Sequence, residues 1–152
     1  MYDVSPGWHT TINPIYYISG KVFYILALVL FVWYIAIKVF KVRKEKYQKP
    51  MNMANLIFCI LGTFLIASYL FDFAMAYSSG FLSEQFSFLL RGAGPYWILY
   101  MALMWIPLLL TQLFWRKKNR VNINLALFIL FMSNMNVWIE WIYVVVSSFM
   151  KQ

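Results

Sequence analysis

Long apolar segments alternate with short polar connections along this chain. The apolar segments cover about residues 14–40, 53–77, 95–115 and 122–149. Each is about 20 residues long or longer, which is the length that a helix needs to cross the hydrocarbon core of a bilayer. The pattern predicts an all-α integral membrane protein in which four helices, joined by short connections, form an up-down transmembrane bundle.

The composition of the chain agrees with a membrane protein. Of its 152 residues, 63% are hydrophobic and only 12% are charged. A soluble domain of this size has no core large enough to hide so much apolar surface. The lipid bilayer is therefore the first expected partner.

Positive charge is concentrated beside two of the connections. The chain has 13 lysine and arginine residues, and most of them are Lys38, Lys41, Arg43, Lys44, Lys46, Lys49, Arg116, Lys117, Lys118 and Arg120. Short basic loops stay in the cytoplasm. Both termini are therefore expected outside, with residues 1–13 as a periplasmic lead and 14–150 as the bundle. The net charge of +8 favours anionic lipid and not nucleic acid as a partner.

The sequence offers few groups for metal or nucleophile chemistry. Cys59 is the single cysteine and His9 the single histidine. The chain cannot form an internal disulfide, a thiolate metal site or a bis-histidine haem site. It also has no glycine-rich phosphate loop, no HExxH motif and no Ser/His/Asp set. We therefore expect no catalytic residue, no metal and no cofactor in this chain.

Three ionisable residues interrupt the apolar segments, namely Lys21, Asp72 and Glu140. Such groups are costly in lipid and usually mark a site that faces the interior of a bundle. With a rise of 1.5 Å per residue, they lie about 7–13 Å from the outer ends of their helices, at similar depth. Two interpretations stay open. One is a buried ion pair that fixes helix packing, although Lys21 can also reach out to the interface; the other is a proton path through the two carboxyl groups.

Uncharged polar residues accompany Glu140 in the last apolar segment. Asn136 lies four residues before Glu140 and therefore on the same helix face, whereas Asn134 lies on another face. Hydrogen bonds between helices explain such amides adequately. Asn134 and Asn136, together with His9, are counted as supporting polar residues.

Several short motifs occur in an order that resembles a known family. They are GWHTTI at 7–12, YLFDF at 69–73 with YSSG at 77–80, GPYW at 94–97, QLFWRKK at 112–118, and WIE at 138–140 followed by VVVSS at 144–148. Together they resemble the C-terminal half of the NrfD / polysulfide-reductase membrane-subunit family. The resemblance is greatest to the large quinol-oxidising membrane subunits of bacterial alternative complex III.

The resemblance implies a respiratory role and a location in the inner membrane of a bacterium, as a multi-pass protein. Members of that family have two four-helix bundles beside a periplasmic module that carries haem and iron–sulfur clusters, and the quinol site lies in the N-terminal bundle. This chain resembles the second bundle only. It would pack against other membrane subunits and periplasmic redox subunits, with haem and iron–sulfur clusters on those partners and a quinone at most at an interface. Asp72 and Glu140 would serve a proton route or only structure.

Two other functions stay open. The chain is alternatively a structural or assembly membrane subunit without a redox role. A third hypothesis is half of a transporter that dimerises around polar groups near the middle of the membrane. The position of the acids in the outer half of the membrane argues against the transporter, because such binding sites lie near the midplane.

The family pattern has an arginine after the glutamate of the last helix, where this chain has Trp141. Our hypothesis is that Lys21 supplies the missing positive charge. Lys21→Met should then destabilise the bundle, at a cost of up to about 3–5 kcal/mol for a broken buried pair. Lys21→Met/Glu140→Gln should recover part of the loss. Thermal unfolding in mild detergent measures both, and a silent Lys21→Met would mean that the two side chains do not pair.

Overall fold

The computed structural model describes residues 7–78, 97–135 and 138–139, and the structural statements below concern these residues. Every element in these ranges is a helix. The elements are α1 (Gly7–Val39), α2 (Lys44–Ser78), α4 (Trp97–Thr111), the 3-10 helix η1 (Gln112–Trp115), α5 (Lys117–Arg120) and α6 (Ile123–Ser133). The prediction of an all-helical protein is confirmed for the described residues.

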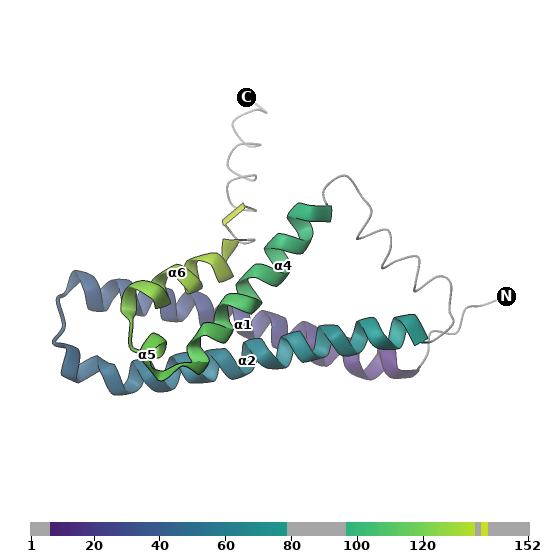
Figure 1. The fold of residues 1–152 in the computed structure, drawn as a ribbon, viewed down its shortest axis with the longest axis horizontal. Coiled ribbons are helices and arrows are strands. Elements are labelled where there is room, and N and C mark those ends of the chain that lie inside the picture. The colour runs from purple at the N-terminus through teal and green to yellow at the C-terminus, as the bar shows by residue number, and fades with distance from the viewer. Residues whose placement is uncertain (1–6, 79–96, 136–137, 140–152) are drawn as a thin grey trace, which may run out of the picture.

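The two longest helices, α1 and α2, form an antiparallel pair (Figure 1). They contain 33 and 35 residues, or roughly 50 Å of helix each, more than the ~30 Å hydrocarbon core of a bilayer. Residues 40–43 reverse the chain between them, and Lys41 takes a left-handed conformation with φ of 48° in this tight turn.

One face of α1 is buried in the core of the molecule. Its members alternate at spacings of four and three residues, which places them on a single side of a helix: Phe23, Ala27, Leu30, Tyr34 and Ile37. Phe23 stacks on Phe58 of α2, with ring centroids 4.6 Å apart. Further partners come from α6, where Ala126, Ile129 and Leu130 are buried.

A second face of each long helix is equally apolar but exposed. On α1 it consists of Ile18, Val22, Ile25, Val29 and Val32, and on α2 of Met53, Ile57, Ile60, Phe64 and Phe71. Only 28% and 22% of the apolar windows of the two helices are buried, whereas the core helix of a soluble protein is mostly buried. These two helices are long and apolar enough to span a membrane, and the described chain leaves most of their apolar surface uncovered.

The shorter elements cover one side of the long pair. Helix α6 packs on α1, and α4, η1 and α5 pack on α2. Helix α4 crosses obliquely, so that its N-terminal end points away from the α1–α2 pair (Figure 1). A regular four-helix up-down bundle is therefore not confirmed by the described residues.

The helices extend beyond the apolar segments that predicted them. Helix α1 begins at Gly7 and not near residue 14, and α2 begins at Lys44 and not near residue 53. A proline commonly breaks a helix, but Pro50 lies inside α2. An apolar segment shows which residues can lie in lipid. A helix, by contrast, continues wherever the hydrogen bonds of its backbone N–H and C=O groups can be formed. Pro50, in the second turn, removes a single N–H from that helix.

The last helix is interrupted where the sequence predicted continuity. Helix α6 ends at Ser133, with Asn134 as its C-cap, and residues 140–149 lie outside the described ranges. Ser133 Oγ donates to the Ile129 carbonyl at 2.8 Å, and Asn134 Nδ2 donates to the Leu130 carbonyl at 3.0 Å. These side chains compete with backbone N–H groups for helical carbonyls, which bends or ends helices.

A glycine of α2 faces Thr111 of α4 and leaves no room for a side chain. Gly62 is buried, and a Cβ atom added to it would overlap the Thr111 hydroxyl of α4. Small residues at such positions let helix backbones come close together. Gly20 on α1 is different, because a Cβ atom there would meet nothing within 4 Å.

Gly62→Ala should therefore loosen the contact between α2 and α4. Overpacking of this kind costs about 1–3 kcal/mol, so the variant should unfold at a lower temperature in mild detergent. Gly20→Ala is the matched control, and it should be neutral or stabilising by up to about 1 kcal/mol because alanine is the better helix former. Equal melting temperatures for the two variants would contradict the close approach.

Candidate functional site

Buried amide and hydroxyl groups join three helices at the end of the pair where α1 turns into α2. Tyr34 donates its hydroxyl proton to Asn55 Oδ1 at 2.8 Å, and Asn55 Nδ2 donates to the Arg120 carbonyl at 2.7 Å. Both side chains are 0% exposed. The amide of Asn55 thus links α1, α2 and α5, and it satisfies a carbonyl at the end of the one-turn helix α5.

A second polar cluster fixes η1 against α2, about two turns farther along α2. Thr63 Oγ1 lies 2.9 Å from Gln112 Oε1, which also accepts a hydrogen bond from Trp115 Nε1 at 3.0 Å. Gln112 Nε2 donates to Thr111 Oγ1 at 3.0 Å. The side chain of Gln112 therefore holds the last turn of this segment to α2 and to its own neighbours.

The two basic connections meet at this same end of the molecule. Asn55 holds α5 beside the first half of α2, and Lys38 Nζ donates to Asn124 Oδ1 of α6 at 3.1 Å. Asn122 caps α6 by accepting from the backbone N–H groups of Asn124 and Leu125. We call this the basic end, because the ten lysine and arginine residues of the two connections lie on or beside these elements.

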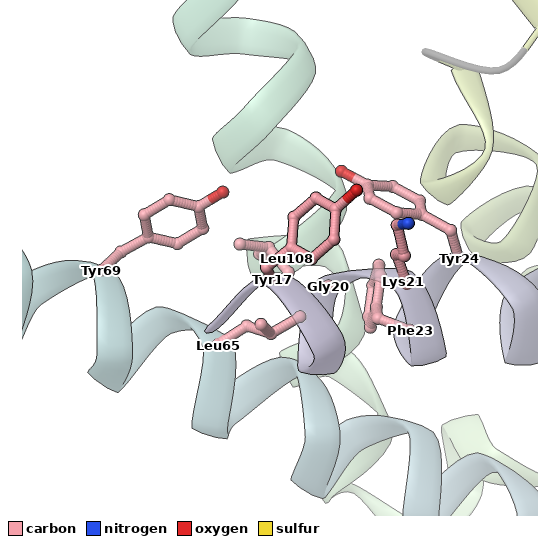
Figure 2. A pocket seen from close by; sticks show the side chains of 8 residues that line it. All are labelled: Tyr17, Gly20, Lys21, Phe23, Tyr24, Leu65, Tyr69 and Leu108. Carbon is pink, nitrogen blue, oxygen red and sulfur yellow. The ribbon is translucent and has the colours of Figure 1, made fainter. Parts of the chain in front are cut away.

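An aromatic pocket of about 190 Å³ lies toward the opposite end (Figure 2). It is lined by Tyr17, Gly20, Lys21, Phe23 and Tyr24 of α1, by Leu65 and Tyr69 of α2, and by Leu108 of α4. We call it the tyrosine pocket. Its floor is formed by the apolar side chains of Phe23, Leu65 and Leu108, which are at most 4% exposed.

The ammonium of Lys21 is held at the rim of the tyrosine pocket. Lys21 is exposed, and its Nζ atom lies 4.2 Å from the centroid of the Tyr17 ring. This distance is within the range of a cation–π interaction. The tyrosine lies one helical turn nearer the N-terminus, so the lysine side chain extends toward the end of the helix, as expected of a lysine that reaches for an interface.

The other predicted site residues are not brought together in the described ranges. Asp72 lies on α2, one turn beyond Tyr69, and is half-buried. Glu140 and Asn136 lie outside the described residues, and of His9 only the backbone, within α1, is described. The pairing of Lys21 with Glu140 and the proton path therefore stay predictions.

Asn134 is buried and uses its amide within its own helix, through the Leu130 carbonyl. The sequence suggested a contact with another helix. The sequence pattern did not predict the side chains that do connect helices, Tyr34, Asn55 and Gln112, because an uncharged polar group in an apolar segment gives a weaker signal than an ionisable one. The available signal for Asn55 was a lone amide inside an apolar segment, which in lipid needs a partner on another element or on its own backbone.

Neither a protein-family model nor a curated protein matches this sequence. The family resemblance of the motifs therefore stays a prediction. Among the residues that the structure describes, no group of three or more His, Cys, Asp or Glu side chains is arranged to hold a metal ion. The described polar groups form hydrogen bonds that join helices, and one of them, Lys21, places a cation beside the tyrosine pocket.

Asn55→Leu should destabilise the protein more than Tyr34→Phe. The leucine leaves both the Tyr34 hydroxyl and the Arg120 carbonyl without their partner, and each such group costs about 1–3 kcal/mol. The phenylalanine leaves only the Asn55 oxygen, which can rearrange. Thermal unfolding in detergent compares the two, and a larger loss for Tyr34→Phe would contradict a central role for the amide.

Proposed function

We propose that this chain is an integral membrane subunit whose basic end lies in the cytoplasm. The observation that carries the proposal is the joining of two charged connections, far apart in sequence, at one end of two helices whose outer faces are apolar and exposed. Translocating such loops is unfavourable, and lipid is the solvent that suits those faces. The opposite end, with the tyrosine pocket, would then lie at the outer surface.

In its full form the proposal is a multi-pass protein of a bacterial inner membrane, with four spans in an up-down order and both termini outside. The described α4 with η1, and α6 with the chain that follows it, would belong to the third and fourth spans. The apolar character of α4 with η1 and of α6 supports this assignment. The short connection through α5 makes these two segments neighbours.

We propose further that the subunit works in a quinol-oxidising respiratory complex of the alternative complex III type. Here it provides helix packing and, through Asp72 and Glu140, a proton route, while haem and iron–sulfur clusters are carried by partner subunits. The order of motifs along the sequence supports this role. The large uncovered apolar faces of α1 and α2 leave room for other membrane subunits beside lipid.

A structural or assembly subunit without a redox role is the second candidate. It is favoured by the use of the described polar side chains, since Asn55, Gln112 and Lys38 bond to neighbouring helices or turns. Such contacts stabilise a scaffold and move no proton. The two candidates agree on the membrane subunit and differ in its contribution to turnover.

Purification of the tagged chain in mild detergent tests the respiratory role. Haem and iron should be measured in the eluate, and both should accompany the chain. Asp72→Asn combined with Glu140→Gln should lower quinol-dependent respiration by about tenfold or more, because positioned proton-transfer groups contribute on the order of 10²-fold.

The matched control is Glu45→Gln, since Glu45 is an exposed acid in the first turn of α2 at the basic end, and it should respire normally. Unchanged turnover of an assembled complex with the double variant would favour the structural role. An eluate without haem and iron would contradict the respiratory complex altogether.

A further inference from the structure

The tyrosine pocket combines a cation with an apolar floor near the end of a membrane-length segment. The apolar segment that contains Lys21 begins near residue 14, so the backbone of Lys21 lies about 10 Å inside it. A lysine side chain that extends toward the helix end brings its ammonium from this depth to the level where the headgroups of a bilayer meet its acyl chains. A pocket at this level meets amphiphilic molecules before it meets solutes from water.

The polar and apolar groups of the pocket are sorted to opposite sides. The hydroxyl groups of Tyr17 and Tyr24 and the ammonium of Lys21 point to the same side, away from Leu65 and Phe23 (Figure 2). The ring of Tyr17 positions the ammonium through its π-face, and a lysine ammonium offers three N–H donors. Such a rim suits an anion with several acceptor oxygens.

The space itself is available and small. A Cβ atom at Gly20 would meet nothing within 4 Å, so the wall of the pocket is open at this position. The volume of about 190 Å³ is below the ~300–1,000 Å³ of sites that enclose a drug-sized ligand. It suits a segment of one acyl chain, with the rest of the molecule remaining in the bilayer.

We propose that the tyrosine pocket binds an anionic phospholipid of the outer leaflet. The phosphodiester accepts hydrogen bonds from Lys21 and the hydroxyl groups of Tyr17 and Tyr24, and an acyl chain lies over Phe23, Leu65 and Leu108. The inference rests on the membrane-spanning part of the proposed function and not on the respiratory role.

Native mass spectrometry of the purified chain, titrated with phosphatidylglycerol or phosphatidylcholine, tests the proposal. The wild type should prefer phosphatidylglycerol. Lys21→Gln should weaken its binding about five-fold, as expected for one basic residue at a membrane surface, and should leave phosphatidylcholine unchanged. Lys21→Arg should restore the preference. Gly20→Leu should fill the pocket and weaken binding of both lipids, whereas Gly20→Ala should not.

Lys49→Gln controls for lipid bound at the basic end and should behave as the wild type. Equal phosphatidylglycerol binding by the wild type, Lys21→Gln and Gly20→Leu would overturn the proposal, as would an equal loss with Lys49→Gln. Competition by millimolar inorganic phosphate would show a free-anion site and overturn the lipid assignment.

If Gly20→Leu does not fold, Lys21→Gln decides alone, because that side chain is exposed. A chain that binds the lipid but purifies without haem supports this inference and counts only against the respiratory role.

Discussion

The arrangement of this protein depends on apolar surface that the helices cannot hide from one another. Helix α1 has a buried face that packs on α2 and α6, and a second apolar face that no described element covers. In water, this exposed apolar surface would carry a large free-energy cost and make the α1–α2 pair insoluble. In lipid, the same surface has an apolar solvent and no such cost. The same constraint explains why ten of the 13 lysine and arginine residues lie in or beside the two connections, where water is near.

Once the helices lie in lipid, hydrophobic attraction no longer holds them together, and specific contacts must do so. The structure supplies two kinds. Close packing occurs where Gly62 admits Thr111, and hydrogen bonds run through the amides of Asn55 and Gln112. The contacts of Asn55 lie near the basic end, and those of Gly62 and Gln112 lie near the middle of α2. Farther along α2 is the tyrosine pocket, where aromatic side chains and one lysine line a space that packing leaves open.

The sequence predicted the features that depend on composition, and it missed those that depend on individual contacts. The helical fold class and the basic connections follow from hydrophobicity and charge along the chain, and these do not depend on which residues are neighbours in space. The start of α2 before Pro50 and the end of α6 at Ser133 do not follow, because they depend on local hydrogen bonds that outweigh the average of a segment. Lys21 stands out in the sequence as a charge within an apolar segment, and it is a rim residue of the pocket. Its position over the Tyr17 ring depends on a side-chain conformation that no sequence pattern predicts. Asn55 is uncharged and is therefore less conspicuous in an apolar segment than Asp72, yet its side chain joins three helices.

The two ends of the α1–α2 pair should lie on opposite sides of a membrane. Single cysteines answer this directly in a Cys59→Ala background, since Cys59 is the sole and buried cysteine. Glu45→Cys and Lys118→Cys probe the basic end, and Ser78→Cys probes the other; all three positions are exposed. In sealed spheroplasts a membrane-impermeant maleimide should label only the variant at position 78, and the other two should react after permeabilisation. Equal labelling of all three from outside, or release of the chain from membranes by alkaline carbonate, would contradict the account.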